Sequence, residues 1–320
     1  MRNLLACMVI LSVLVPFAIG CGQSKPTSDF SIHVYTRSDA CGGSETWAKY
    51  LGNYKQEDLK GTAVYGDPGL SEAVIKDALG IGYNNIGYAY DTKTGEQLAG
   101  LRVIPIDINE NGKIDNDENF YDKKATLVQA IAEGRYPSPP ARDLYLATKS
   151  KFSGISKEFV RWILNDGQKY VDDMGYIKLP NEKIEQQLNK LGQTEPGIQM
   201  EGTITISGAF ALYPMMIRWG EEFQKVYPNI RLDISAGGAG KGMTDALNGM
   251  VDMGMISREI NAAEIEKGAF WVAVTKDAVV PVTNRSNPFL KDILAKGLKK
   301  QTFIDIWITE NISDWRSAIQ

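Results

Sequence analysis

Apolar and polar positions along the chain follow two periods that alternate from segment to segment. Segments such as 30–35 alternate residue by residue, which is typical of strands, whereas 212–226 places apolar side chains three and four residues apart, as in an amphipathic helix. The pattern predicts strands or extended segments at 30–35, 85–90, 101–107, 143–148, 203–207, 231–235, 251–256 and 270–282. It predicts helices at 44–51, 70–79, 124–133, 157–174, 212–226, 242–250 and over most of 289–320. Strands that alternate with helices indicate an α/β fold with parallel sheets.

The start of the chain has the pattern of an export signal. Arg2 precedes an apolar run over 4–20 that ends at a small residue, which predicts a signal peptide over 1–20. The residues Ala-Ile-Gly-Cys at 18–21 resemble a bacterial lipoprotein cleavage site, in which Cys21 would carry the lipid and 21–29 would be a linker. A plain signal peptide and a short membrane span are the alternatives, although about 17 apolar residues are marginal for a span. We therefore expect an extracytoplasmic protein, in the periplasm or on the cell surface, held to a bacterial membrane by its lipid alone.

Composition narrows the classes of function. The chain has 320 residues, enough for two lobes, and its formal net charge of −4 argues against general nucleic-acid binding. Of three cysteines, Cys7 belongs to the signal and Cys21 would carry lipid, so Cys41 has no partner for a disulfide. The one histidine, His33, argues against a zinc site.

Two glycine-rich turns are the most informative local features. The segment 36–47 follows a predicted strand that ends in Arg37 and opens a helix, and 235–243 is a second turn of the same kind. The free N–H groups and the dipole of a helix start attract an anion, and a guanidinium can close over it. Two such turns predict one oxyanion held between two lobes.

These segments resemble the phosphate-binding proteins that serve as substrate-binding proteins of bacterial and archaeal ABC transporters. The segment 203–259, which includes TISGAFALYPMM and SAGGAGKGM, resembles the first half of that family, and FIDIWITENISDW (303–315) its middle. VYTRSDACGGSETW (34–47), IGYNNIGYAY (81–90) and FVRWILNDGQKYVDDMGYIKLP (159–180) resemble its second half. The resemblance implies a two-lobed periplasmic-binding-protein fold, type II-like, with two crossover strands.

The two halves stand in reversed order, which indicates a circular permutation or, alternatively, a wrongly assembled gene. A permutation predicts that Phe30 and Gln320 are neighbours on one lobe. The expected lobe one combines 30–105 with 284–320, and a connection with an insertion spans 106–139. The expected lobe two is 140–275, with a linker at 192–201 that joins the permuted halves, and 276–283 is a crossover.

The resemblance also implies the ligand-binding residues. Arg37 matches the family's anion-clasping arginine, and Asp39 would orient it. Cys41 stands where the family usually has serine, so backbone N–H groups would matter more than the thiol, and Lys241 would compensate for the alanine at 239. Ser257 falls near a family carboxylate that accepts the proton of hydrogen phosphate. The predicted set is Arg37, Asp39, Cys41, Gly42, Gly43, Phe210, Ala211, Leu212, Gly238, Ala239, Lys241 and Ser257.

A separate motif at 107–118 has the spacing of a twelve-residue calcium loop. Its predicted ligands are Asp107, Asn109, Asn111, Lys113, Asp115 and Glu118, with glycine at position 6 and an apolar residue at position 8. An extended segment precedes it instead of a helix, so the motif predicts structural calcium without a full EF-hand. The alternative is an acidic, turn-rich surface loop.

The favoured function is a monomeric solute-binding lipoprotein that captures phosphate or a similar tetrahedral oxyanion for an ABC importer, with the transporter permease as its partner. No catalytic cofactor is expected. A two-lobed sensor or adhesion protein that no longer binds phosphate is the alternative, because hydroxyl side chains are missing from the turns. An enzyme that uses Cys41 or the 107–118 loop is a third reading, and it lacks a base near the thiol.

Overall fold

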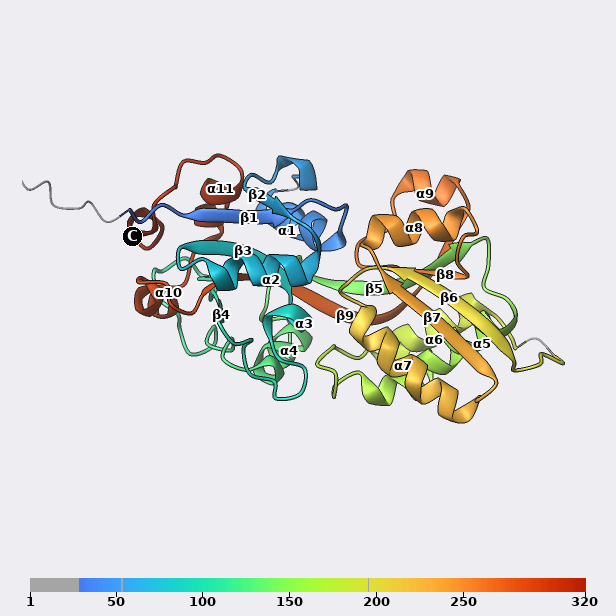
Figure 1. Cartoon of the computed structure of the whole chain (residues 1–320). Helices are drawn as coiled ribbons and strands as arrows, with labels where there is room; N and C mark the ends of the chain where they lie inside the picture. The colour runs from blue at the N-terminus through green and yellow to red at the C-terminus, as the bar shows by residue number, and fades with distance from the viewer. Residues whose placement is uncertain (1–28, 53, 195) are drawn as a thin grey trace, which may run out of the picture.

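Two lobes, each with its own hydrophobic core, are joined by two long strands (Figure 1). The computed structural model describes residues 29–52, 54–194 and 196–320, so the predicted signal peptide and the lipid site at Cys21 lie outside the described residues. Lobe one contains β1 (His33–Arg37), α1 (Gly42–Gly52), η1 (Gln56–Asp58), β2 (Thr62–Val64), α2 (Gly66–Lys76), β3 (Gly80–Asn85), α3 (Ile86–Ala89), β4 (Leu101–Val103), α4 (Lys124–Ala132), α10 (Leu290–Lys296), α11 (Lys300–Trp307) and α12 (Trp315–Ala318). Lobe two contains α5 (Gly154–Leu164), η2 (Asp166–Tyr170), α6 (Asn181–Leu191), β6 (Gly202–Gly208), α7 (Tyr213–Val226), β7 (Ile230–Ala236), α8 (Ala239–Leu247), β8 (Met253–Ile256) and α9 (Ala262–Glu266). The joining strands are β5 (Ala141–Lys149) and β9 (Ala269–Asn284).

One sheet runs through both lobes because they share β9. The strand order is β2-β1-β3-β9-β5-β8-β6-β7, and β4 also pairs with β9. One end of β9 is antiparallel to β3 and the other end is antiparallel to β5, with Arg142 opposite Asp277. Within each lobe the outer strands are parallel, β1 with β2 and β3, and β6 with β7 and β8. Parallel strands end at one edge of the sheet, so the loops that follow them lie together.

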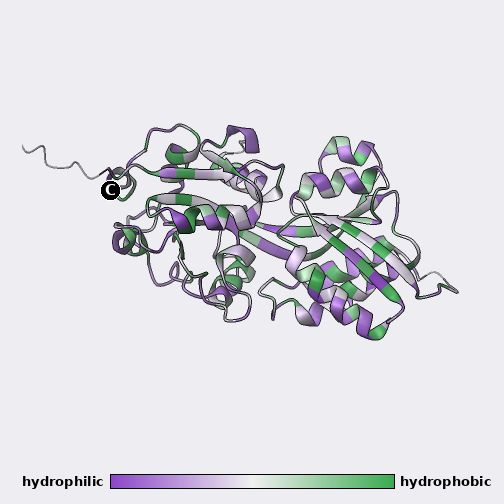
Figure 2. Cartoon of the chain, viewed as in Figure 1, coloured by the Kyte–Doolittle hydropathy of each residue, from purple (hydrophilic) through white to green (hydrophobic). Residues whose placement is uncertain are grey.

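The hydrophobic pattern explains why these segments form these elements. In β7 the side chains alternate between buried or half-buried and exposed positions, and Figure 2 shows the matching alternation of polar and apolar residues along it. Helix α7 buries Met215, Met216, Trp219 and Phe223 at helical spacing, and all four are fully buried in the core of lobe two. The prediction of an α/β fold is thereby confirmed.

Two predicted elements are wrong in detail. The segment 85–90 was expected as a strand, but β3 already ends at Asn85 and Ile86–Ala89 is a short helix that buries Ile86 and Ala89. The expected helix over 157–174 stops at Leu164, where Asn165 leaves helical geometry. The break brings the Gly167 carbonyl to the Trp219 indole N–H at 2.8 Å, a tertiary contact that helical periodicity does not contain.

The two ends of the described chain meet on lobe one. The N–H of Ile32 donates to the carbonyl of Ser313 at 2.7 Å, and the N–H of Trp315 donates to the carbonyl of Phe30 at 3.0 Å. In Figure 1 the C-terminus lies beside the start of β1. A circular permutation requires this neighbourhood, and the permuted order itself stays a prediction. Among the described helices, none combines the length and apolar character of a membrane span.

Candidate functional site

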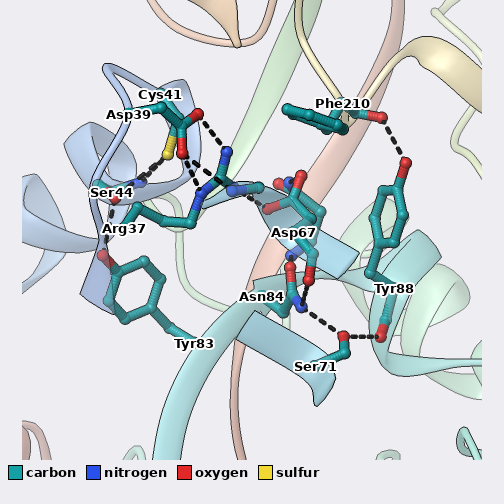
Figure 3. A network of polar contacts seen from close by, with 12 residues as sticks. Arg37, Asp39, Cys41, Ser44, Asp67, Ser71, Tyr83, Asn84, Tyr88 and Phe210 are labelled. Atoms are coloured by element: carbon teal, nitrogen blue, oxygen red, sulfur yellow. Dashed lines mark hydrogen bonds and ion pairs between the residues drawn. The ribbon is translucent and has the colours of Figure 1, made fainter. Parts of the chain in front are cut away.

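Arg37 is the centre of a buried polar network where lobe one faces lobe two (Figure 3). It is the last residue of β1 and is 5% exposed. Its Nε donates to Asp39 Oδ1 at 2.8 Å and its Nη2 to Asp39 Oδ2 at 2.5 Å, while its Nη1 donates to Asp67. The guanidinium carbon lies 5.5 Å from the ring centre of Phe210, which belongs to lobe two. Burial opposes the guanidinium charge, but Asp67 and Asp39 outweigh it and raise the pKa of Arg37 above its usual value.

The start of α1 forms the second part of the site. Gly42 and Gly43 are its first two residues, whose N–H groups have no carbonyl one turn earlier to bond. The Cys41 N–H is already engaged, because it donates to Gln56 Oε1 at 2.9 Å. The Cys41 sulfur accepts the N–H of Ser44 at 3.3 Å, and burial raises the pKa of the thiol. Cys41 therefore caps the helix as a neutral thiol.

Lobe two contributes the turn after β6. The Ala209 N–H donates to the Met255 carbonyl at 2.8 Å, and the Leu212 N–H donates to the Ala209 carbonyl at 3.1 Å. Within the described chain the N–H groups of Phe210 and Ala211 have no hydrogen-bond acceptor. Tyr88 from lobe one donates its hydroxyl to the Phe210 carbonyl at 3.2 Å, which ties the two lobes together at this turn.

The turn before α8 also touches lobe one. Gly238 has a φ of 90°, and a Cβ there would lie 2.8 Å from the Ala40 carbonyl oxygen and 2.9 Å from Asp39 Oδ2. Gly42 is equally tight, since a Cβ on it would lie 2.1 Å from the Ser257 carbonyl oxygen. Glycine at these two positions permits the lobes to approach this closely.

The predicted ligand set lies mostly at one place between the lobes, but three of its donors are already engaged, among them the Cys41 N–H described above. The ammonium of Lys241 is bonded to Asp245 on its own helix, which also accepts the Ser207 hydroxyl at 2.7 Å. The Leu212 N–H is engaged within its own turn. The other members, Arg37, Asp39, Cys41, Gly42, Gly43, Phe210, Ala211, Gly238, Ala239 and Ser257, surround the facing ends of β1, β6 and β8.

Sequence reasoning missed the residues behind Arg37. Asp67 is 3% exposed, its Oδ2 accepts from Asn85 Nδ2 at 2.6 Å, and its backbone carbonyl accepts from Asn84 Nδ2 at 2.9 Å. Burial raises the pKa of Asp67 above its ordinary value, although the positive charge of Arg37 opposes this shift. Asn84 and Asn85 could have been found from the sequence, because they end a strand that is parallel to β1. Asp67 could not, because it follows β2, a strand that the sequence pattern did not predict.

The network continues into the strands that join the lobes. Arg142 of β5 donates to Asn85 and to Thr46 Oγ1 at 3.0 Å, and lies 3.6 Å from Asp277 of β9. Asp277 is fully buried, its Oδ2 has no hydrogen-bond partner among the described residues, and burial raises its pKa to about 6. Arg142 also borders a cavity of about 810 Å³ between the lobes, which the ion pairs Lys49–Glu259 and Arg258–Glu45 flank.

The predicted calcium loop is held by hydrogen bonds between its own residues. Asp115 Oδ2 accepts from the side chains of Asn109 at 3.1 Å and Asn111 at 2.7 Å, and Lys113 pairs with Asp115 at 2.6 Å. Asp107 accepts the N–H groups of Asn111 and Gly112, and Glu118 accepts those of Ile108, Asn109 and Asp115. In the described part of the chain no group of three or more His, Cys, Asp or Glu side chains is arranged to hold a metal. Calcium binding by this loop stays a prediction.

The fold is that of a two-lobed binding protein with a cavity between its lobes, and comparison with known proteins agrees with this class. Residues 23–167 and 193–319 match the model of the PBP superfamily domain, and the chain belongs to this superfamily. The phosphate-binding protein PstS 2 of Streptococcus agalactiae is 27% identical over 292 residues, which cover 88% of this chain and 87% of that protein. PstS 2 of Streptococcus pneumoniae is 23% identical over 282 residues, covering 84% of this chain and 85% of its own.

A solved structure shows the same fold. The crystal structure of a phosphate-binding protein of a phosphate ABC transporter from Streptococcus pneumoniae matches with a TM-score of 0.57 and 21% identity, over 90% of this chain and 99% of that one. The prediction of a periplasmic-binding-protein fold is confirmed.

Proposed function

We propose that the protein is a solute-binding protein that captures phosphate between its lobes and delivers it to an ABC importer. The observation that carries the proposal is the meeting of two anion-binding turns beside Arg37. The guanidinium of Arg37 lies 5.5 Å from the ring of Phe210, whose turn has two N–H groups without an acceptor in the described chain. The start of α1, with the N–H groups of Gly42 and Gly43, contacts the same lobe at Ser257. The relatives named above, which are called phosphate-binding proteins, support phosphate as the ligand.

The arrangement suits an oxyanion for a physical reason. A tetrahedral oxyanion in a dry cleft needs donors on several sides, and charge-assisted hydrogen bonds are the strongest of these. Backbone N–H groups at a helix start are fixed in place before the anion arrives, so little ordering cost opposes binding. The tight glycine contacts at Gly42 and Gly238 keep side chains out of the space where the two lobes meet.

Binding without catalysis fits the chemistry of the site. The Cys41 thiol is neutral and accepts a hydrogen bond from the helix it caps. His33 lies at the other end of β1 and bonds Asp77 at 2.7 Å, so it cannot act as a base for that thiol. We infer that the protein is a transport protein instead of an enzyme. We further infer that it is a monomer, that lipid on Cys21 holds it at the outer side of a membrane, and that it docks on a transporter permease.

Titration calorimetry with phosphate, sulfate, molybdate and tungstate tests the proposal, with Arg37→Ala as the informative variant. Removal of one member of a buried charged contact costs about 2–5 kcal/mol. At about 1.4 kcal/mol per decade, affinity for phosphate falls roughly 30-fold to several thousand-fold.

The matched control is Arg316→Ala. Arg316 pairs with Asp314 two residues away, as Arg37 pairs with Asp39, but it is exposed and far from the cleft. We expect Arg316→Ala to bind as the wild type does. Thermal melts of both variants show whether they fold. A wild-type protein that binds none of the four anions, yet is folded, would favour the sensor or adhesion reading.

A further inference from the structure

The candidate site has more negative than positive side chains around Arg37, which is unusual for a site that binds an anion. The single guanidinium of Arg37 already bonds two carboxylates, Asp39 and Asp67, and every one of its nitrogens is engaged. The side chains of these three residues are 2%, 9% and 4% exposed, so water screens none of them. An incoming oxyanion therefore meets one positive and two negative side chains.

The wider surroundings of Asp67 do not correct this balance. The charged and titratable groups that act on it are Arg37 at the end of β1, Asp39 and Cys41 between β1 and α1, Tyr88 from α3, Arg142 from β5, Tyr176 after η2 and Asp277 from β9. Cys41, Tyr88 and Tyr176 are neutral, because burial raises the pKa of each. With Asp277 charged, two cations face three carboxylates before any ligand arrives.

Asp67 has little freedom to move aside. Its Oδ2 is bonded to Asn85 at 2.6 Å, its carbonyl to Asn84 at 2.9 Å, and it lies in the first turn of α2. Asn85 also accepts a hydrogen bond from Arg142. The Asp67 carboxyl is therefore held by Arg37 at one oxygen and by Asn85 at the other. A rotation of the Asp67 side chain would break these contacts, whereas a proton would remove its charge and leave them in place.

We propose that Asp67 couples capture of the oxyanion to uptake of one proton from solvent, which neutralises this carboxyl or is shared between it and the nearest oxygen of the anion. The proposal rests on the proposed function and adds a regulation to the same site. The proton lets Asp67 donate a hydrogen bond where its carboxylate would only repel. Burial already favours the protonated form of Asp67, and a nearby anion raises the pKa of the carboxyl further.

The sign of the pH dependence follows from linkage. If the complex holds one proton more than the free protein, affinity falls as pH rises, by up to tenfold for each pH unit, roughly. We therefore expect phosphate affinity to decline steadily from neutral to alkaline pH. Asp67→Asn keeps the size of the side chain and removes both its charge and its titration, so this variant would bind more tightly at alkaline pH, by about tenfold or more.

Proton uptake can be counted directly. Phosphate binding is measured by calorimetry in two buffers of different ionisation enthalpy. The pH is about 8.5, at which phosphate in solution is almost entirely the hydrogen phosphate dianion. The dependence of the measured enthalpy on that of the buffer gives the number of protons taken up. We expect close to one for the wild type and close to zero for Asp67→Asn, with Asp172→Asn, an exposed aspartate paired with Lys178, as the matched control that stays at one.

The outcomes separate the two claims. If neither the wild type nor Asp67→Asn binds phosphate, the proposed function fails. If the wild type binds with no proton uptake, the role of Asp67 is overturned whether or not the variant folds. If uptake is one in both proteins, the proton sits elsewhere and the assignment to Asp67 is wrong.

Discussion

At the scale of the residue, the junction of the lobes is defined by buried charges that only partly satisfy one another. Asp277 is the extreme case, since its Oδ1 accepts only the neighbouring Ala278 N–H and its Oδ2 has no partner in the described chain. Arg142 is 3.6 Å away and is bonded more closely to Asn85 and Thr46. An under-satisfied buried carboxyl is destabilising when it is ionised, because it has lost water without gaining an equal partner.

We expect Asp277→Asn to stabilise the protein at neutral pH. The folded-state pKa of about 6 lies above the ordinary 3.8, so the folded protein keeps a proton that the unfolded chain has lost. Stability from this group is therefore greatest below about pH 4 and falls as pH rises to about 6. The variant should flatten that decline and raise the free energy of unfolding at pH 7 by about 1–3 kcal/mol. Urea denaturation of the wild type and the variant at about pH 4 and at pH 7 measures this. An equal change in the free energy of unfolding between the two pH values in both proteins would contradict the prediction.

At the scale of the element, strand ends and helix starts build the candidate site, and one further loop has a separate prediction. The segment Asp107–Glu118 directs the carboxylates of Asp107 and Glu118 inward, where they are 1% and 4% exposed and bonded to backbone N–H groups of the same loop. A loop closed on its own carboxylates is compact before any cation arrives, and its spacing matches a calcium loop.

Calcium is expected to raise the melting temperature of the wild type. Calcium that binds only the folded state stabilises that state by mass action. The free energy of unfolding rises by about 2.7 kcal/mol when the calcium concentration is a hundred times the dissociation constant. Asp107→Ala and Glu118→Gln should each abolish the rise. Asp117→Asn is the matched control, since it removes a carboxylate of the same loop at a position outside the ligand pattern. Melts that are identical in chelator and in millimolar calcium would show the loop to be a surface turn.

At the scale of the whole molecule, the path of the chain and the position of its ends matter most. Lobe one is built from both ends of the described chain, which meet through the hydrogen bonds of residues 30–32 with 313–315. Lobe two is a continuous insertion between β5 and β9. A chain cut between α6 and β6 and closed at residues 29 and 320 would keep every strand pairing.

We therefore expect a permuted protein that starts near Glu201, joins Gln320 to Asp29 through a short glycine-serine linker and ends near Gly192 to fold and to bind phosphate as the natural order does. The control is a permuted chain opened between Ala278 and Val279, which cuts the strand shared by both lobes and should not fold. Circular dichroism and calorimetry measure both. Failure of the first protein would contradict the inference that the two orders are equivalent.

Periodicity and helix-start chemistry are local properties of the chain, so they predict the α/β class, most helices and strands, and the turns at Arg37–Gly43 and Phe210–Leu212. The choice of partner for each charged side chain depends on the tertiary structure. Arg37 meets Asp67, thirty residues away, and Arg142 meets Asp277 across two strands, whereas Lys241 turns to Asp245 on its own helix. The tertiary structure also decided that the Cys41 N–H is taken by Gln56 and that the helix predicted at 157–174 breaks at Asn165. Partner choice depends on which segments are buried together, and burial is set by the packing of the whole fold.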